Sequence, residues 1–412
     1  MHAGCSDSGR PALASNRRQH LRAFLLRLAA WLLRLFRRPA SRKVDRSISR
    51  AWIVRPDHLG DFLFATPALD RWLQATGNNV HTTLSVGTWC AELARHGPEV
   101  EHLELFPYPG FTRNAKGQWW SPYRALIRQA RCLRREQYDM AIILRFDHWW
   151  AGLLACLAGI PHRIGYDTDP LRHCLTSRVP YQGTTHEVER NLTLIDHALT
   201  LTGYAPASSD DGFPDLIYHV QDKDRDAMTT LLAEHRITAG LPMVIIHPGA
   251  GAAVKEWPAQ RFAAVADALI AEMDATVVLT GASGDLGVAW KVAAYMHEDA
   301  LVLAGQTSIG ELGALLEGSN LVIGSDSGPL HLAVAVGAPS LHLYGPVDPA
   351  MFGPWSAQPD RHRVLMVDCD CAPCNHLDFS PAELLGHRCM ETISVDQVVD
   401  AARAMLAGNR HA

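Results

Sequence analysis

Three short runs of this chain combine glycine with a charged or hydroxyl side chain where a strand pattern gives way to a helical one. The first run is RPDHLGDFLFATPAL, from Arg55 to Leu69. Gly60 lets the chain turn where a side chain would clash, and Asp61 follows it in the loop. A carboxylate in that place can accept a proton from a hydroxyl group. The alternative is an aspartate that caps the following helix.

The second run is HPGAGAAVKEWP, from His247 to Pro258. Gly249 and Gly251 expose backbone N–H groups, the helix that follows contributes positive potential, and Lys255 adds a mobile cation. This combination suits a diphosphate. The run is not a Walker A sequence, because it contains no GxxxxGK[ST].

The third run is GSDSGPLHLAVAVGAP, in which Asp326, Ser327 and Gly328 follow an apolar strand pattern and His331 lies at the start of an apolar helix. Two strand ends that can accept an anion in one domain indicate a nucleotide diphosphate. His331 by itself also fits a capping or packing role.

Several other patterns carry less weight. The run GASGDLG, residues 281–287, lacks the GxG start of a dinucleotide-binding loop. Asp368 and Asp370 form a DxD triplet, which is too short to establish a metal site, so we assign no catalytic metal. Four cysteines near the C-terminus allow structural zinc, a redox-labile pair or ordinary reduced thiols: Cys369, Cys371, Cys374 and Cys389. The nine cysteines do not form a secreted disulfide framework, which favours a reducing cytoplasm.

Short apolar runs alternate with helical patterns through the rest of the chain, which predicts parallel sheets built from βαβ units. We expect strands at residues 51–54, 80–86, 140–144, 243–247, 276–280, 321–324 and 340–344. We expect helices at residues 66–75, 122–135, 258–273, 311–317, 331–336 and 395–406. The alternation restarts after a polar stretch near residue 210. The predicted domains are a basic arm and linker (1–50), a first domain (51–210), a second domain (211–390) and a last helix (391–412) that packs back on the first domain.

The 412 residues are 48% hydrophobic and 20% charged, which excludes a disordered, fibrous or polytopic membrane protein. The net charge of -5 conceals an asymmetry, since residues 1–50 hold twelve Lys and Arg and two acidic residues. The arm therefore carries +10 and the rest of the chain -15. An acidic body argues against broad nucleic-acid binding, whereas the arm suits RNA or an anionic membrane.

The apolar segment of the arm, Leu21 to Phe36, is interrupted by arginines, and its longest uninterrupted apolar run is Leu28 to Leu33. We therefore expect neither a transmembrane helix nor a standard signal peptide. On a helix the residues His20, Arg27, Arg34 and Arg38 form one stripe beside a broad apolar face. This pattern suits a helix lying among anionic lipid headgroups, and the alternative is a solvated tail.

Taken together, the three runs resemble the family 9 glycosyltransferases, which include the lipopolysaccharide heptosyltransferases. The resemblance covers roughly residues 51 to 405. It rests on LGD with TPAL, HPG with K-x-W-P, and DSGPLHLA followed by Gly345 and Pro346. YDMAIILRFD, IPHRIGYD, HEVERN and the C-terminal CxPC add to it.

The resemblance implies an α/β GT-B fold with two Rossmann-like domains facing a central cleft, an acceptor in the first and a nucleotide sugar in the second. It implies that Asp61 is the general base and that Lys255 binds the donor phosphate. Donor contacts are implied for Gly249, Gly251, Asp285, Asp326, Ser327, Gly328 and His331. Asp285 stands where the family commonly has a glutamate for the ribose.

The implied reaction is inverting and independent of metal. Asp61 removes a proton from the acceptor hydroxyl as its oxygen attacks the anomeric carbon, and Lys255 with the loop amides stabilises the departing diphosphate. We expect transfer of heptose from ADP-heptose to a cell-envelope glycolipid such as the lipopolysaccharide core, with no cofactor besides the nucleotide sugar. The alternatives are a sugar-nucleotide epimerase or hydrolase of the same fold, and a noncatalytic sugar-nucleotide-binding module.

In the first domain we expect acceptor contacts from Arg145, Asp147, His148 and Trp149, which follow a strand. A basic segment contains Arg113, Lys116, Arg124, Arg128, Arg131, Arg134 and Arg135. This segment suits either an anionic glycolipid or a solvated helix face. The expected location is the cytoplasmic face of the inner membrane of a Gram-negative bacterium, held by the arm, with no nucleic-acid partner.

Overall fold

The structure is a computed structural model that describes residues 48–108, 121–169, 171–206, 214–237, 240–384, 387 and 389–409. The arm up to residue 47, Arg113 and Lys116 lie outside these residues, so the predictions made for them stay predictions. The chain divides into two compact units, with the main division between Gly212 and Phe213. Two short segments from the first half, Leu59–Thr66 and Arg95–Pro98, belong to the second unit. The boundary predicted near residue 210 places both in the first domain, so the structure corrects this prediction for the two segments.

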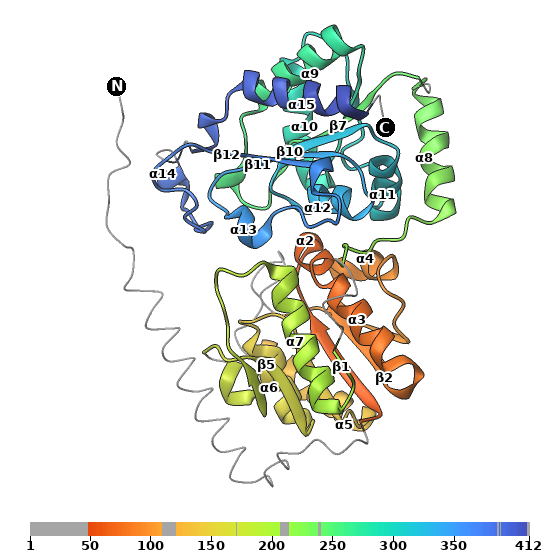
Figure 1. The fold of residues 1–412 in the computed structure, drawn as a ribbon, viewed down its shortest axis with the longest axis vertical. Coiled ribbons are helices and arrows are strands. Elements are labelled where there is room, and N and C mark those ends of the chain that lie inside the picture. Colours follow the sequence, from red (N-terminus) through yellow and green to blue (C-terminus); the bar gives the residue numbers. More distant parts are fainter. Residues whose placement is uncertain are drawn as a thin grey trace. The chain divides into compact units, whose positions relative to one another are not determined.

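The first unit is built on a six-stranded parallel sheet in the order β3-β2-β1-β4-β5-β6. Figure 1 labels β1, β2 and β5 of this sheet. Its strands are β1 (Arg50–Arg55), β2 (His81–Gly87), β3 (His102–Phe106), β4 (Met140–Ile143), β5 (His162–Tyr166) and β6 (Ser177–Val179). In the register of the centre, Val54 of β1 lies between Ser85 of β2 and Ile143 of β4. The order reverses between β1 and β4, as in doubly wound nucleotide-binding folds.

The helices of the first unit are α3 (Thr66–Thr76), α4 (Ala91–Arg95), α5 (Ser121–Glu136), α6 (Trp149–Ala158) and α7 (Glu187–Thr202). Short 3-10 turns lie at Gly77–Asn79, Thr88–Cys90 and Leu171–Cys174. One core of this unit joins α5 and α6 to side chains of the central strands such as Trp52, Val54 and Ile143. Gly159 caps the carboxyl end of α6, and its φ of 88° lies in the left-handed region that glycine adopts without strain.

The second unit repeats the same winding. Its parallel sheet has the order β12-β11-β10-β7-β8-β9, which reverses between β7 and β10. The strands are β7 (Met243–His247), β8 (Thr276–Leu279), β9 (Leu301–Val302), β10 (Leu321–Ser325), β11 (Ser340–Tyr344) and β12 (His362–Met366). The two sheets are therefore topologically equivalent, and the α/β fold class predicted from the sequence is confirmed.

The longer helices of the second unit are α8 (Asp222–Glu234), α9 (Ala259–Met273), α10 (Leu286–Tyr295), α11 (Ile309–Glu317), α12 (Gly328–Ala335) and α15 (Val395–Asn409). Shorter helices are α2 (Leu59–Leu63), α13 (Pro349–Phe352) and α14 (Pro381–Leu384). Short 3-10 turns lie at Ala253–Lys255, Ser283–Asp285, Pro359–Arg361 and Cys389–Thr392. Within the described residues no helix is long and apolar enough to cross a bilayer.

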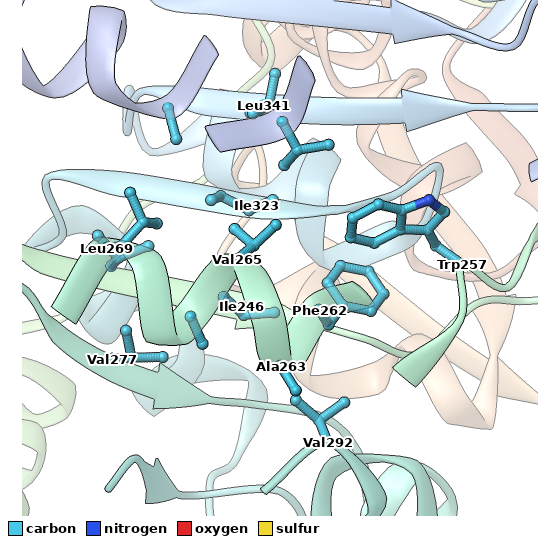
Figure 2. Close-up of a cluster of buried hydrophobic side chains, with 14 of the residues drawn as sticks. Ile246, Trp257, Phe262, Ala263, Val265, Leu269, Val277, Val292, Ile323 and Leu341 are labelled. Atoms are coloured by element: carbon cyan, nitrogen blue, oxygen red, sulfur yellow. The ribbon is translucent and has the colours of Figure 1, made fainter. Parts of the chain in front are cut away.

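The core of the second unit lies between its sheet and the helices α9, α10 and α15 (Figure 2). Apolar residues of α9 such as Phe262 pack on alternating strand residues such as Ile246 and Ile323. Trp257 meets Phe262 edge to face, with 4.9 Å between ring centroids. The last helix, α15, contributes Val398 and other buried residues to this core. This helix thus belongs to the second unit, and its expected packing on the first domain stays a prediction.

Candidate active site

Each unit has one point where the order of its strands reverses, and ligands of open α/β sheets bind outside the carboxyl ends of strands at such points. In the first unit Arg55 ends β1, and Arg145 follows β4. In the second unit His247 ends β7 and Ser325 ends β10. The polar runs singled out in the sequence thus follow the central strands of two equivalent sheets.

In the second unit, three predicted donor residues form one buried cluster. The Nζ atom of Lys255 lies 3.0 Å from Oδ2 of Asp326, and Nε2 of His331 lies 3.3 Å from Oδ1 of the same carboxylate. Burial raises the pKa of Asp326, but His331 and Lys255 outweigh it and hold the pKa well below its usual range. The carboxylate is therefore ionised at neutral pH and keeps the ammonium group in place.

The position of Lys255 follows from its neighbours. It ends the short turn Ala253–Lys255 that follows the glycine-containing loop, and a Cβ added to Gly251 would lie 3.9 Å from its Nζ atom. Two residues later Trp257 is buried, and its indole N–H donates to the carbonyl oxygen of Ile393 at 3.2 Å. Trp257 thus anchors the segment that carries Lys255 to the core.

Asp285 lies against two glycines that follow neighbouring strands. A Cβ added to Gly249 would come within 2.8 Å of the Asp285 carboxylate, and one added to Gly281 within 2.7 Å of its Cβ. The carboxylate also accepts a hydrogen bond from the N–H of Ala282 at 2.9 Å. Both glycines are thus required by the close approach of this aspartate. Burial and the nearby Asp285 also raise the pKa of Glu256, a second carboxyl group that the sequence analysis did not single out.

Four buried side-chain atoms around the same strand ends have no hydrogen-bond partner among the described residues: Nδ1 of His247, Oγ1 of Thr280, Oγ of Ser325 and Oγ of Ser327. A buried polar atom left unpaired costs about 1–3 kcal/mol, so folded proteins pair such atoms with protein, water or ligand. Burial also lowers the pKa of His247, which favours the neutral ring. These atoms are suited to hydrogen-bond a polar ligand at the end of this sheet.

Ser327 and Gly328 begin α12, and the helix that carries Asp61 packs directly on this start. A Cβ added to Gly328 would lie 2.8 Å from the side chain of Leu59, and one added to Gly60 would lie 3.0 Å from the His331 ring. The two glycines therefore allow α2 and α12 to touch. Asp61 is half-buried in the first turn of α2, so the structure brings its helix onto the donor cluster.

In the first unit the corresponding strand ends carry a network of buried ion pairs. Nε of Arg55 lies 2.7 Å from Oδ2 of Asp57, and its NH2 lies 3.0 Å from Oε1 of Glu187. Arg55 also donates to Oδ1 of Asn191 at 3.1 Å, and Glu187 pairs with Arg190 at 2.8 Å. All five side chains are almost fully buried. The sequence analysis missed this network because charged residues are normally expected at the surface.

The predicted acceptor residues join this network from the other central strand. Arg145 pairs with Asp57 and lies 2.5 Å from Oδ1 of Asp147, and 28% of its side chain is exposed. Burial lowers the pKa of His148 to about 4, so its imidazole is neutral at neutral pH. Trp149 begins α6 and is half-buried. The predicted acceptor residues thus lie beside Asp57, while the predicted donor residues lie in the second unit.

The cysteine cluster does not assemble into a metal site within the described residues. Sγ of Cys369 lies 3.6 Å from Sγ of Cys371, and burial with two nearby cysteines, Cys371 and Cys374, raises the pKa of Cys389. No group of three or more potential ligands is positioned to hold a metal ion in the part of the chain that the structure describes. The zinc interpretation of these cysteines is therefore not supported.

Comparison with known proteins identifies the family. The model for "Glycosyltransferase family 9 (heptosyltransferase)" matches residues 126–380. The chain belongs to glycosyltransferase family 9. Lipopolysaccharide heptosyltransferase 3 of Escherichia coli K12 is 30% identical to this glycosyltransferase over 304 residues, which cover 72% of the chain and 83% of the relative.

Two solved structures share the fold of this glycosyltransferase. A family 9 glycosyl transferase from Veillonella parvula has a TM-score of 0.70 at 23% identity, covering 89% of this chain and 100% of that one. The ADP-heptose lipopolysaccharide heptosyltransferase II of E. coli has a TM-score of 0.68 at 22% identity, covering 88% and 99%. The resemblance found in the sequence and its α/β GT-B fold are thus confirmed.

Proposed function

We propose that this glycosyltransferase transfers heptose from ADP-heptose to a cell-envelope glycolipid such as the lipopolysaccharide core, with inversion at the anomeric carbon. The similarity to lipopolysaccharide heptosyltransferase 3 supports the sugar and the acceptor class. The similar fold of the ADP-heptose lipopolysaccharide heptosyltransferase II of E. coli supports the donor. The observation that carries the proposal is the Lys255–Asp326–His331 cluster, around which buried polar atoms have no partner among the described residues.

In the proposed reaction the second unit binds the donor. Lys255 and the N–H groups at Ser327 and Gly328 receive the negative charge that develops on the departing diphosphate. Asp326 pairs with Lys255 and with His331. It also contacts the sugar. Asp285 binds the ribose, and Gly249 and Gly281 allow its side chain to lie against the ends of β7 and β8.

Asp61 acts as the general base of the proposed reaction. It takes the proton from the acceptor hydroxyl as that oxygen attacks the anomeric carbon from the side opposite the diphosphate. The packing of α2 on the start of α12 supports this role, because it places the aspartate's helix beside the proposed diphosphate-binding amides. Arg145, Asp147, His148 and Trp149 bind the acceptor.

The proposed location is the cytoplasmic face of the inner membrane of a Gram-negative bacterium. The lipid-linked acceptor class supports this location, as does the basic, amphipathic pattern of the arm. Deletion of residues 1–47 should weaken binding of the protein to anionic vesicles. It should leave transfer to a soluble acceptor fragment intact.

The direct test incubates the full-length protein with ADP-heptose, with and without a heptose-accepting core glycolipid. The proposal expects ADP release that depends on the acceptor, together with an acceptor heavier by one heptose. UDP-N-acetylglucosamine serves as the mismatched donor. Acceptor-independent ADP release would indicate hydrolysis, and donor binding without any product would indicate a noncatalytic module.

A further inference from the structure

The helix α5 of the first unit (Figure 1) is strongly basic, and it has no part in the proposed reaction. We infer that this helix docks on an anionic lipid bilayer through Arg124, Arg128, Arg131 and Arg135. These four residues, called here the arginine stripe, are spaced by four, three and four positions. That spacing places them on one side of a helix.

All four arginines of the stripe are exposed, and none forms a hydrogen bond or ion pair with another described residue. Their neighbour Arg134 behaves differently, because its guanidinium donates to the carbonyl oxygens of Leu157 and Ala158. Like charges at i, i+3 and i, i+4 destabilise an isolated helix. Arg134 thus contributes to the packing of the fold. The arginines of the stripe are available to bind a partner outside the described chain.

The stripe also has an apolar neighbour. Ile127 lies on the same side of α5 and is 50% exposed, whereas Leu126, Ala130 and Leu133 on the other side are buried in the core. Basic side chains beside an exposed apolar one are typical of helices that lie in the headgroup region of a membrane. An anionic lipid surface can satisfy both the arginines and the isoleucine.

The length and direction of the stripe favour a bilayer over the glycolipid's saccharide. From Arg124 to Arg135 the helix advances about 16 Å. Glu136, at the end of α5, pairs with Arg50, the first residue of β1, at 3.3 Å. The stripe therefore ends beside the amino end of β1, away from the carboxyl ends that carry Arg55 and Arg145. A ligand held at those carboxyl ends would reach only one end of the stripe, whereas a flat surface contacts all of it.

The basic arm enters the described part of the chain at the same end of α5. The Arg50–Glu136 pair places the start of β1, just after Ile48, beside the last turn of this helix. A bilayer bound by the arm would thus meet the stripe close to the arm's attachment point. This inference extends the proposed membrane association to the folded body of the enzyme, and it does not depend on the identity of the donor.

The first experiment measures binding of the full-length protein to vesicles of phosphatidylcholine with one-third phosphatidylglycerol. Replacement of all four stripe arginines by glutamine should weaken binding by at least tenfold and by up to about 1,000-fold, since each basic residue near an anionic surface contributes about 1 kcal/mol. The matched control replaces four exposed basic residues of the second unit, Lys223, Arg236, Arg361 and Arg363. Equal loss in the two variants would overturn the inference, because it would indicate a response to net charge alone.

The second experiment uses the unmodified protein, so it does not depend on the folding of a variant. Cys132 is exposed on α5 beside the stripe, and Cys374 is exposed in the second unit. Alkylation followed by peptide mass spectrometry should show slower modification of Cys132 on anionic vesicles, with Cys374 as the internal reference. Pure phosphatidylcholine vesicles should give no protection.

Unchanged alkylation of Cys132 on vesicle-bound protein would overturn the inference and leave binding by the arm intact. Protection of Cys132 by inorganic phosphate or by a soluble core oligosaccharide, without lipid, would also overturn it, by assigning the stripe to a soluble anion or to the acceptor. Failure of the ADP-heptose assay is a separate result, because neither vesicle experiment contains a nucleotide sugar.

Discussion

The two units place charged residues at equivalent points of equivalent sheets, yet the two clusters differ in what they leave unpaired. In the first unit Arg55, Asp57 and Glu187 are paired with one another and almost fully buried. In the second, Lys255 and Asp326 are paired, but buried hydroxyl and imidazole atoms beside them have no partner among the described residues. The first cluster is thus completed by the protein itself, and the second is suited to be completed by a ligand.

Position in a doubly wound fold therefore does not by itself decide the role of a charged residue. A buried charge network mainly determines local geometry, because loss of one member leaves another charge buried and unpaired. A cluster whose buried polar atoms have no partner among the described residues is suited to bind a ligand. Mutations of Arg55 or Glu187 should therefore act mainly on stability, and mutations of Lys255 should act mainly on the reaction.

The largest expected effect is on stability in the first unit. Arg55→Met would leave Asp57 and Glu187 without their shared partner, and the free energy of unfolding should fall by about 3–5 kcal/mol. Urea denaturation measures this change. The control is Arg225→Met, which breaks an exposed pair with Glu317 and should have a much smaller effect. A small effect of Arg55→Met would mean that the network is not structural.

The next effect is on turnover and concerns Asp61. Asp61→Asn removes the proposed proton acceptor while keeping the size of the side chain, and it should lower turnover about 100-fold or more. Calorimetric affinity for ADP should remain near that of the unaltered enzyme, because the aspartate acts on the acceptor. Turnover close to normal would contradict the general-base role.

A smaller effect is expected on donor binding in the second unit. Lys255→Ala removes a charge-assisted contact worth about 1.5–3 kcal/mol, so affinity for ADP should fall about tenfold or more. Lys223→Ala, at an exposed lysine of α8, is the matched control. If both variants bind ADP with the same affinity in calorimetry, Lys255 does not contact the diphosphate.

The smallest effect is a pH dependence of stability from His148. Burial lowers its pKa to about 4 in the folded state, against about 6.5 when unfolded, so on acidification the unfolded chain takes up the proton first. His148 should therefore lower the free energy of unfolding by about 1 kcal/mol as the pH falls from 6.5 to 5.5. The decrease should be larger toward pH 4. In denaturation at several pH values, His148→Gln should lose less stability on acidification than the unaltered protein. The control His235→Gln, at an exposed histidine, should lose as much stability as the unaltered protein. Parallel pH profiles for His148→Gln and the unaltered protein would contradict this prediction.

The central strands were predictable from the sequence, whereas most of the edge strands were not. The runs at residues 51–54, 243–247 and 321–324 are buried on both faces, so they are continuously apolar and match β1, β7 and β10 closely. The outer strands β3 and β12 are largely half-buried and carry charged or polar residues, so their composition resembles that of loops. Periodicity therefore detects the strands that are covered on both faces.

Some residues of the candidate site were likewise predictable from the sequence, and others were not. Glycines and charged residues next to predicted strands were enough to single out Gly249, Lys255 and Asp326. Arg55 and Glu187 lie far apart in the sequence and meet only through the tertiary fold. The signal that existed was the charged pair in RPDH and the acidic start of HEVERN, whose partners no local pattern specifies.

The enzyme cannot be divided into its two units at one point of the chain. The reason is that Leu59–Thr66 and Arg95–Pro98 belong to the second unit. The chain passes between the units five times, so no single cut separates them. A fragment beginning at Phe213 would lack Gly60, which packs on α12, and His96, whose ring stacks on Tyr218 at 4.8 Å between centroids. Exchange of halves between family members should therefore transfer both short segments together with the C-terminal half.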